Sequence, residues 1–179
     1  FMGDPKRIRK KYETPTHPWQ KSRIVEEKEL IKRFGLKNHK ELWRLKTFVS
    51  KQRKEVMRLI PLKTEQAEKE KKQLMDKLVR LGLLSKDSQI TDVLNLTVED
   101  ALNRRLQTLV FKKGLARTIK QARQMIVHGH IVVNGVSVTS PSYLVSVDEE
   151  PTIDFNVNSP FYSEDHPERV SVKGGVGNE

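Results

Sequence analysis

The sequence predicts an α+β protein, in which a helical N-terminal region with an extended basic arm precedes two short helices on a small, mostly antiparallel sheet. Three observations predict this fold. Apolar residues recur at three-, four- and seven-residue spacings, an Asn-Gly pair joins two β-branched runs, and prolines and cations fill the start of the chain. The predicted parts are an arm, a helical domain, a helix-and-sheet domain and an acidic, flexible tail, at 1–22, 23–97, 98–155 and 156–179.

The charge of this chain indicates a polyanionic partner. The 179 residues carry a net charge of +11, which fits binding to nucleic acid or to an anionic membrane surface. Residues 1–60 hold 18 Lys and Arg against 7 Asp and Glu, residues 100–139 hold 7 against 1, and residues 140–179 hold 2 against 8. Such segregation is more than solubility requires.

Several classes of protein are disfavoured. No apolar run approaches the roughly 20 residues that span a bilayer, and no apolar signal segment opens the chain. We therefore expect a cytosolic protein without a membrane partner. Cysteine is absent and the five histidines are scattered, so we expect no disulfide, metal site or cofactor.

The first 22 residues predict an extended arm. Three prolines interrupt any helical or strand period. Composition alone also fits a solvated tail, but cations close to Tyr12 and Trp19 favour an arm that orders on RNA, where such side chains stack on unpaired bases. The cations expected to contact RNA are Lys6, Arg7, Arg9, Lys10 and Lys11.

Helix signals begin after the arm. Ser22 is a plausible N-cap for the first helix, and Gly35 is a stop signal. A second helix is expected to start at Asn38, with Glu41 three residues on as in a capping box, and to end before Pro61.

The second helix is amphipathic and basic. Arg53 and Lys54 on its polar side are candidate RNA contacts, although a solvated surface explains any single charge equally well. A third helix is predicted over 64–81, with Thr64 as its cap and Gly82 as its stop signal. Residues 83–96 are expected to form an irregular connection with one turn of helix near 91–94.

A helix from Val98 to about Val110 is predicted next, capped by Thr97. Arg105 falls inside its apolar stripe, so we expect the stem to pack and the guanidinium to emerge at the rim. Arg104 is expected to form an intrahelical ion pair with Asp100.

A second short helix, capped by Thr118, is predicted to run to His128 and to be closed by Gly129. At 100° per residue, its cations and one amide share an outer face opposite an apolar one. Clustered cations repel one another unless an anion neutralises them, and RNA phosphates would do so. The expected RNA contacts in and before this helix are Lys112, Lys113, Arg117, Thr118, Lys120, Arg123 and Gln124.

The segment HIVVNGVSV predicts a β-hairpin. Runs 131–133 and 136–138 flank Asn134-Gly135, the strongest two-residue hairpin signal. Runs 144–147 and 152–155 are expected to extend the sheet, which the two preceding helices would cover.

Two blocks of the sequence also resemble a known family. LNRRLQTLVFKKGLARTIKQARQMI, followed by VNG and PSY, resembles the α-L RNA-binding motif of a small-subunit ribosomal protein, pseudouridine synthases, tyrosyl-tRNA synthetases and a heat-shock protein. MGDPKRIRKKYETPTHPW, with GLKNHKELWR, is similar to the archaeal and eukaryotic branch of the small-subunit ribosomal protein four family.

This resemblance implies a non-enzymatic protein of the small ribosomal subunit. It implies binding to rRNA of the body early in assembly, a place beside protein five near the channel through which messenger RNA enters, a contribution to translational accuracy, and no small-molecule substrate. The family's RNA-contacting positions match Arg105, Lys112, Thr118 and Ala122-Arg123. Ile119 stands where bacterial members often have Arg, which shifts that expected contact to Arg117 and Lys120, and the bacterial cysteine zinc site has no counterpart here.

Two other functions remain open from the residues alone. An RNA-modifying enzyme could use the same motif to hold its substrate, but no converging acid, base or nucleophile is visible. A factor that rescues stalled ribosomal subunits would have no evident use for the helical N-terminal half.

Overall fold

The computed structural model describes residues 10–163, 166–167 and 169 of the chain. Its α-helices are α1 (Lys21–Arg33), α2 (His39–Leu59), α3 (Glu65–Arg80), α4 (Val98–Asn103), α5 (Leu106–Lys112) and α6 (Ile119–Val127). Its strands are β1 (Ile131–Val133), β2 (Val136–Ser137) and β3 (Asp154–Phe155), and its 3-10 helices are η1 (Ile90–Asn95), η2 (Glu150–Thr152) and η3 (Pro160–Tyr162). None of the described helices is both long and apolar enough to cross a membrane.

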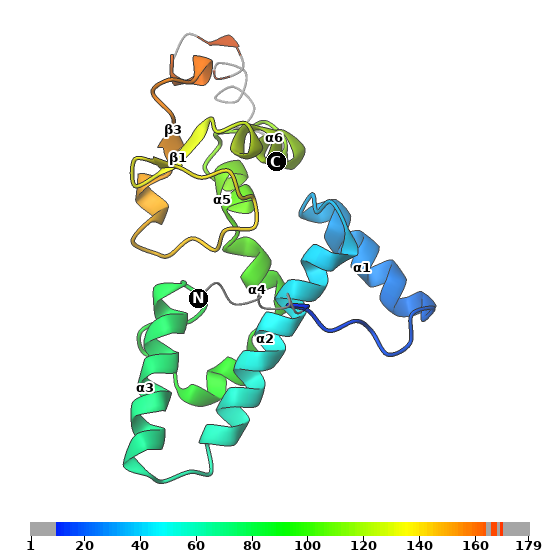
Figure 1. The fold of residues 1–179 in the computed structure, drawn as a ribbon, viewed down its shortest axis with the longest axis vertical. Helices are drawn as coiled ribbons and strands as arrows, with labels where there is room; N and C mark the ends of the chain where they lie inside the picture. Colours follow the sequence, from blue (N-terminus) through cyan, green and yellow to red (C-terminus); the bar gives the residue numbers. More distant parts are fainter. Residues whose placement is uncertain (1–9, 164–165, 168, 170–179) are drawn as a thin grey trace, which may run out of the picture.

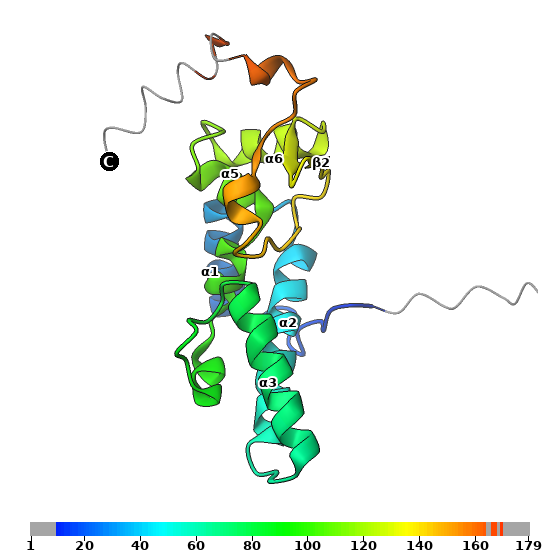
Figure 2. The same ribbon diagram turned by 90° about the vertical axis from the view of Figure 1, so that its left-hand side faces the viewer.

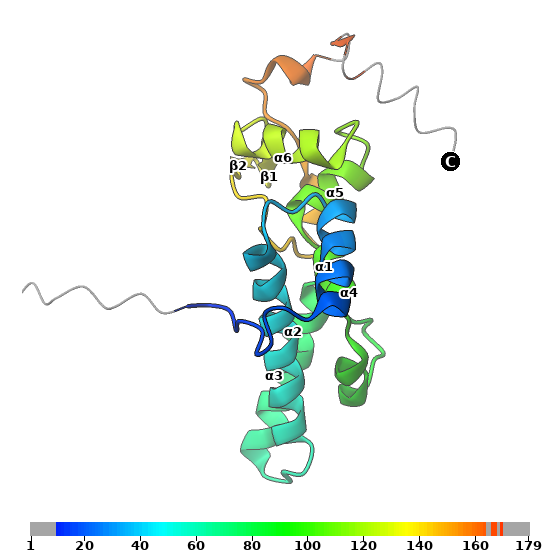
Figure 3. The same cartoon turned by 90° about the vertical axis from the view of Figure 1, so that its right-hand side faces the viewer.

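The molecule is elongated, with a helical end and a mixed end (Figure 1). The antiparallel pair α2 and α3 extends away from the sheet, as Figure 2 shows from one side. Helix α1 contacts α2 and diverges from it at a wide angle in Figure 1, and Figure 3 shows the pair from the other side. The predicted α+β class, a helical region followed by two short helices and a small antiparallel sheet, is confirmed.

Helix α2 is the centre of the helical end, because α1, α3, α4 and η1 all contact it. Asn38 caps it by accepting a hydrogen bond from the backbone N–H of Glu41 at 3.2 Å, as predicted. The Glu41 carboxylate does not complete a capping box, however, because it binds two arginines further along the chain. The apolar side of α2 is buried through Leu42, Leu45, Val49, Val56 and Leu59.

Some of the other predicted helix boundaries are confirmed, and one is wrong. Thr64 caps α3 and Gly82, with φ +66°, follows its end, as predicted. The N-cap predicted at Ser22 is wrong, because α1 begins at Lys21. The turn before α1 is stabilised by Arg23, which donates hydrogen bonds to the carbonyls of His17 at 3.2 Å and Pro18 at 2.8 Å. The predicted turn near 91–94 is η1.

The single helix predicted over 98–110 is broken at Arg104 and Arg105, which separate α4 from α5. Residues 143–145 cause the break by pairing with this segment: Leu106 N donates to Tyr143 O at 2.8 Å, and Val145 N donates to Arg104 O at 3.1 Å. Apolar periodicity continues through the break, so the sequence pattern does not reveal it.

The break separates two hydrophobic cores. The first, in the helical end, ends at Leu102, and the second, under the sheet, begins at Leu106. Arg104 crosses the junction and binds Glu150 at 2.6 Å and the Val145 carbonyl at 3.1 Å. Its predicted ion pair with Asp100 is therefore wrong, since the Asp100 carboxylate accepts from Thr97 at the start of α4.

The sheet has the order β2-β1-β3 and is antiparallel throughout. Asn134, with φ 51°, and Gly135, with φ 76°, form the predicted hairpin turn. β3 supplies the third strand from within 152–155, as predicted. The run 144–147 does not join the sheet, because Leu144 forms only an isolated bridge with Arg105.

The segment after β3, for which a flexible tail is expected from residue 156, packs on the mixed end in its first described residues. Ser159 is buried and caps η3 by accepting from Phe161 N at 3.2 Å. The ring of Phe161 packs on the second core, with its centroid 6.2 Å from that of Phe155. This part of the predicted tail therefore belongs to the mixed end of the molecule.

Candidate nucleic-acid interface

Exposed cations surround the connection between α5 and α6. Lys112 ends α5, Arg117 lies just before α6, and Lys120 lies in its first turn. All three side chains are exposed, and within the described part of the chain none has an ion-pair partner. Lys113 is also exposed, and its ammonium lies 3.5 Å from the Ile153 carbonyl. Close cations without carboxylates favour binding of an anion.

Helix α6 presents the predicted apolar and polar faces at most positions. Ala122, Met125 and Ile126 are buried in the second core, and Gln124 is exposed. Thr118 caps the helix, its hydroxyl accepting from Gln121 N at 3.2 Å, as predicted.

Arg123 departs from the predicted outer cluster. Its guanidinium binds Glu41 of α2, with Nη2 at 2.7 Å from Oε1 and Nη1 at 3.2 Å from Oε2. The expectation of an open, anion-seeking Arg123 beside Lys120 is therefore wrong for this structure, because an internal carboxylate already neutralises it.

Arg105 also departs from its prediction. The side chain is only 2% exposed, and its Nη2 lies 2.7 Å from Glu41 Oε2, so the guanidinium does not emerge at a rim. A buried guanidinium needs a paired anion to remain charged without a large desolvation penalty. Glu41 supplies that anion for both arginines.

Gln107 completes this polar cluster between the two ends of the molecule. Its amide nitrogen donates to the carbonyls of Gly35 at 3.1 Å and Ile119 at 3.0 Å, and its oxygen accepts from Arg123 at 3.4 Å. We call Glu41, Arg105, Gln107 and Arg123 the junction cluster. Burial would raise the pKa of the Glu41 carboxyl, but hydrogen bonds from Arg123 and Arg105 outweigh it and hold that pKa below its ordinary value.

A second buried carboxylate holds α1 against α2. Glu27 is 1% exposed and binds Lys46 at 2.7 Å, Arg23 at 3.0 Å and Trp43 at 3.2 Å, while His39 Nδ1 lies 3.1 Å away. Burial alone would raise its pKa, but these partners, Lys46 foremost, lower it from 4.5 to about 2.

The described part of the basic arm lies on this region. Tyr12 packs near Trp43, with ring centroids 6.1 Å apart, and Glu13 N donates to Thr47 Oγ1 at 2.9 Å. Trp19 is 91% exposed, so its ring is available for stacking. Lys10 and Lys11 are exposed, whereas Lys6, Arg7 and Arg9 lie outside the described residues.

The two residues of α2 that were predicted to contact RNA, Arg53 and Lys54, differ in their exposure. Arg53 is partly buried and donates to the Leu96 carbonyl, so it ties η1 to α2 and does not lie on the open basic surface that was expected. Lys54 is exposed, and its ammonium lies 3.8 Å from Glu13 of the arm.

Sequence reasoning missed the second role of Glu41. A hollow of about 380 Å³ at the junction is lined by Glu41, the exposed Arg44, both junction arginines and Ser142. One signal was present in the sequence: Glu41 is the sole acidic residue from 30 to 54, a range that holds nine Lys and Arg. A lone carboxylate among so many cations is a natural ion-pair centre.

One family model matches the second part of the chain. The model of the family described as S4 domain matches residues 104–150, which starts at the break between α4 and α5. This range lies inside the predicted helix-and-sheet domain of 98–155.

Full-length relatives come from methanogenic archaea. "Small ribosomal subunit protein uS4" of Methanococcus maripaludis is 53% identical over 172 residues, covering 96% of this chain and 97% of the relative. The same protein of Methanococcus aeolicus is 53% identical over 174 residues (96% and 98%), and that of Methanothermobacter thermautotrophicus is 50% identical over 159 residues (89% and 93%). This chain belongs to the family of small ribosomal subunit protein uS4.

Proposed function

We propose that this protein is a structural, non-enzymatic constituent of the small ribosomal subunit that binds small-subunit rRNA through its S4 domain. One observation carries the proposal: Lys112, Arg117 and Lys120 lie around the connection between α5 and α6 as exposed cations that have no carboxylate partner in the described structure. Phosphates of a folded RNA strand would neutralise them and release counterions. Lys113 and Gln124 border the same surface.

The junction arginines have a different role in this proposal. Arg105 and Arg123 orient the S4 domain on the helical domain through Glu41 rather than serving as the main phosphate contacts. Specificity then comes from RNA shape, because the protein presents a preset arrangement of cations and because side chains read the deep groove of A-form RNA poorly. Lys10, Lys11 and Trp19 add contacts from the arm.

The finer placement in the ribosome rests on the family resemblance. We propose early binding to the body, contact with protein five, a position near the channel where messenger RNA enters, and a contribution to accuracy. The exposed carboxylates Asp148 and Asp154 support contact with a basic protein at the mixed end, since they would repel phosphate. Cross-links from this end to protein five in assembled subunits test that placement, and cross-links to rRNA alone would contradict it.

The test of rRNA binding is the salt dependence of affinity. The triple substitution Lys112→Ala, Arg117→Ala and Lys120→Ala is expected to weaken binding to a small-subunit rRNA transcript. It should also reduce the slope of log affinity against log salt by about 1 for each phosphate that the variant no longer binds. Lys72→Ala, an exposed cation on α3, is the matched control. An unchanged slope in the triple variant would contradict the proposed surface.

A further inference from the structure

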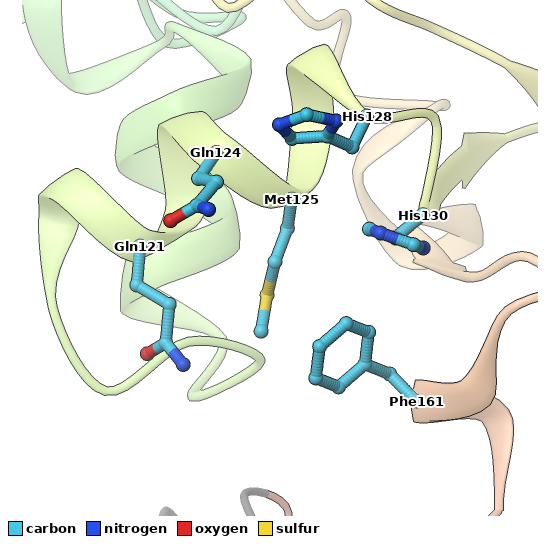
Figure 4. Close-up of a pocket in the computed structure, with 6 residues that line it drawn as sticks. All are labelled: Gln121, Gln124, Met125, His128, His130 and Phe161. Carbon is cyan, nitrogen blue, oxygen red and sulfur yellow. The ribbon is translucent and has the colours of Figure 1, made fainter.

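A cavity of about 340 Å³ opens between α6 and the η3 turn. Figure 4 shows Gln121 and Gln124 on one side of it, His130 and Phe161 on the other, Met125 between them and His128 above. The volume falls within the range of about 300–1,000 Å³ typical of small-ligand pockets. Five of the six lining residues lie within the range matched by the S4 family, and Phe161 lies beyond it.

The walls are held in place by contacts that no ligand needs to create. The His130 ring lies edge-on to Phe161, with centroids 5.0 Å apart, and its Nδ1 lies 2.9 Å from the buried hydroxyl of Ser159. Asn156 fixes the adjoining turn, its side-chain amide donating to Gly129 O at 3.2 Å and its backbone N–H to His130 O at 2.8 Å. A preorganised aromatic wall binds a flat ligand with little loss of side-chain entropy.

The chemistry of the lining suits a flat heteroaromatic group. Met125 and Phe161 provide an apolar floor, and the exposed Gln124 and His128 at the rim can donate and accept hydrogen bonds. An aliphatic anchor from a protein would leave these polar groups unpaired on binding, whereas a base edge would satisfy them.

The charge around the cavity favours a nucleotide over other flat ligands. Lys120 lies four residues before Gln124, so both side chains share one face of α6, about 5–6 Å apart at Cβ. A base in the cavity would therefore place its own phosphate near an exposed ammonium. Among the described residues, none that lines the cavity carries a carboxylate.

We propose that this cavity binds one unpaired base of small-subunit rRNA. The base stacks against the aromatic wall of Phe161, Gln124 and His128 bind its edge, and Lys120 contacts its phosphate. Sequence-specific RNA recognition commonly uses such splayed bases. This inference rests on the proposed rRNA binding and adds to it a site that recognises a base.

A direct test titrates the full chain with cytidine and adenosine 5′-monophosphates and follows its methionine methyl and histidine ring resonances by NMR. Met125, His128 and His130 are expected to shift, while the exposed Met57 on α2 stays unchanged as an internal control. Ribose 5-phosphate, which lacks a base, is expected to leave Met125 unshifted. Equal shifts with ribose 5-phosphate, or none with either nucleotide, would overturn the proposal.

Binding to the rRNA transcript separates this inference from the proposed function. Gln124→Ala and His128→Ala are each expected to weaken binding on the order of 10-fold with an unchanged salt slope, and Val127→Ala, an exposed neighbour outside the lining, should bind like the parent. If both cavity variants bound the transcript as tightly as the parent, the proposed base site would be contradicted while the proposed rRNA binding would stand. Shifts of the Met125 resonance on removal of residues 170–179 without RNA would show that the chain itself fills the cavity and would also overturn it.

Discussion

Glu41 of α2 and Arg123 of α6 lie 82 positions apart in the sequence and are joined by hydrogen bonds of 2.7 and 3.2 Å. The same carboxylate binds the buried Arg105, so one acidic group neutralises two cations where the helical end meets the S4 domain. The relative orientation of the helical end and the S4 domain therefore depends on a buried electrostatic contact as well as on apolar packing.

Glu41→Gln is expected to lower the free energy of unfolding by about 3–5 kcal/mol, because Arg105 would remain buried without a counter-charge. Urea denaturation followed by circular dichroism measures this change. Glu70→Gln is the matched control, since it removes the exposed pair with Arg58 and is expected to change stability by less than about 1 kcal/mol. Similar losses in the two variants would show that Glu41 is no more than another surface carboxylate.

Glu27 is expected to make the protein sensitive to acid. Its folded-state pKa of about 2 lies below the ordinary 4.5, so its stabilisation is complete above pH 4.5 and is lost as the pH falls towards 2. The shift corresponds to about 3 kcal/mol. Unfolding free energies between pH 7 and pH 3 should fall more steeply for the parent than for Glu27→Gln, and Glu29→Gln, an exposed neighbour on α1, should follow the parent. Parallel curves for all three proteins would contradict the role of Glu27.

Gly35 marks a close approach between the two ends of the molecule. Its φ is +57°, and a Cβ there would lie 2.8 Å from Ile119 Cγ2 and 3.0 Å from Gln107 Nε2. Gly35→Ala therefore combines backbone strain with a steric clash. Gly135→Ala, at φ +76° with nothing within 4 Å of the new Cβ, isolates the strain. We expect Gly135→Ala to destabilise by about 1 kcal/mol and Gly35→Ala by about 1–3 kcal/mol more, measured by thermal unfolding. Equal losses of stability in the two variants would mean that the neighbours of Gly35 accommodate the new methyl group without an energetic penalty.

Local signals in the sequence predicted most of the elements and their ends. Asn38, Thr64, Thr97 and Thr118 cap helices where predicted, since a side-chain oxygen three residues before an N–H is a short-range interaction. The hairpin turn at Asn134-Gly135 was predictable for an equally local reason, because these two residue types tolerate the positive φ that the turn requires.

Apart from the N-cap predicted at Ser22, the errors involve contacts between distant segments. The helix break at Arg104 and Arg105 comes from backbone pairing with residues 143–145, which no periodicity in 98–110 records. Similarly, helical geometry placed Arg123 correctly on the polar face of α6, but only the approach of α2 brought Glu41 to it.

The sequence by itself determined the identities of the helices, the hairpin, the excess of positive charge and the family, because each is encoded in residues that are close together or in direct similarity. Tertiary structure alone decided which cations remain available to an anion. Lys112, Arg117 and Lys120 stay exposed while Arg105, Arg123 and Arg53 are used internally. The physical reason is that a charge is neutralised by whatever lies within a few ångströms of it, and those neighbours are set by packing between segments far apart in the chain.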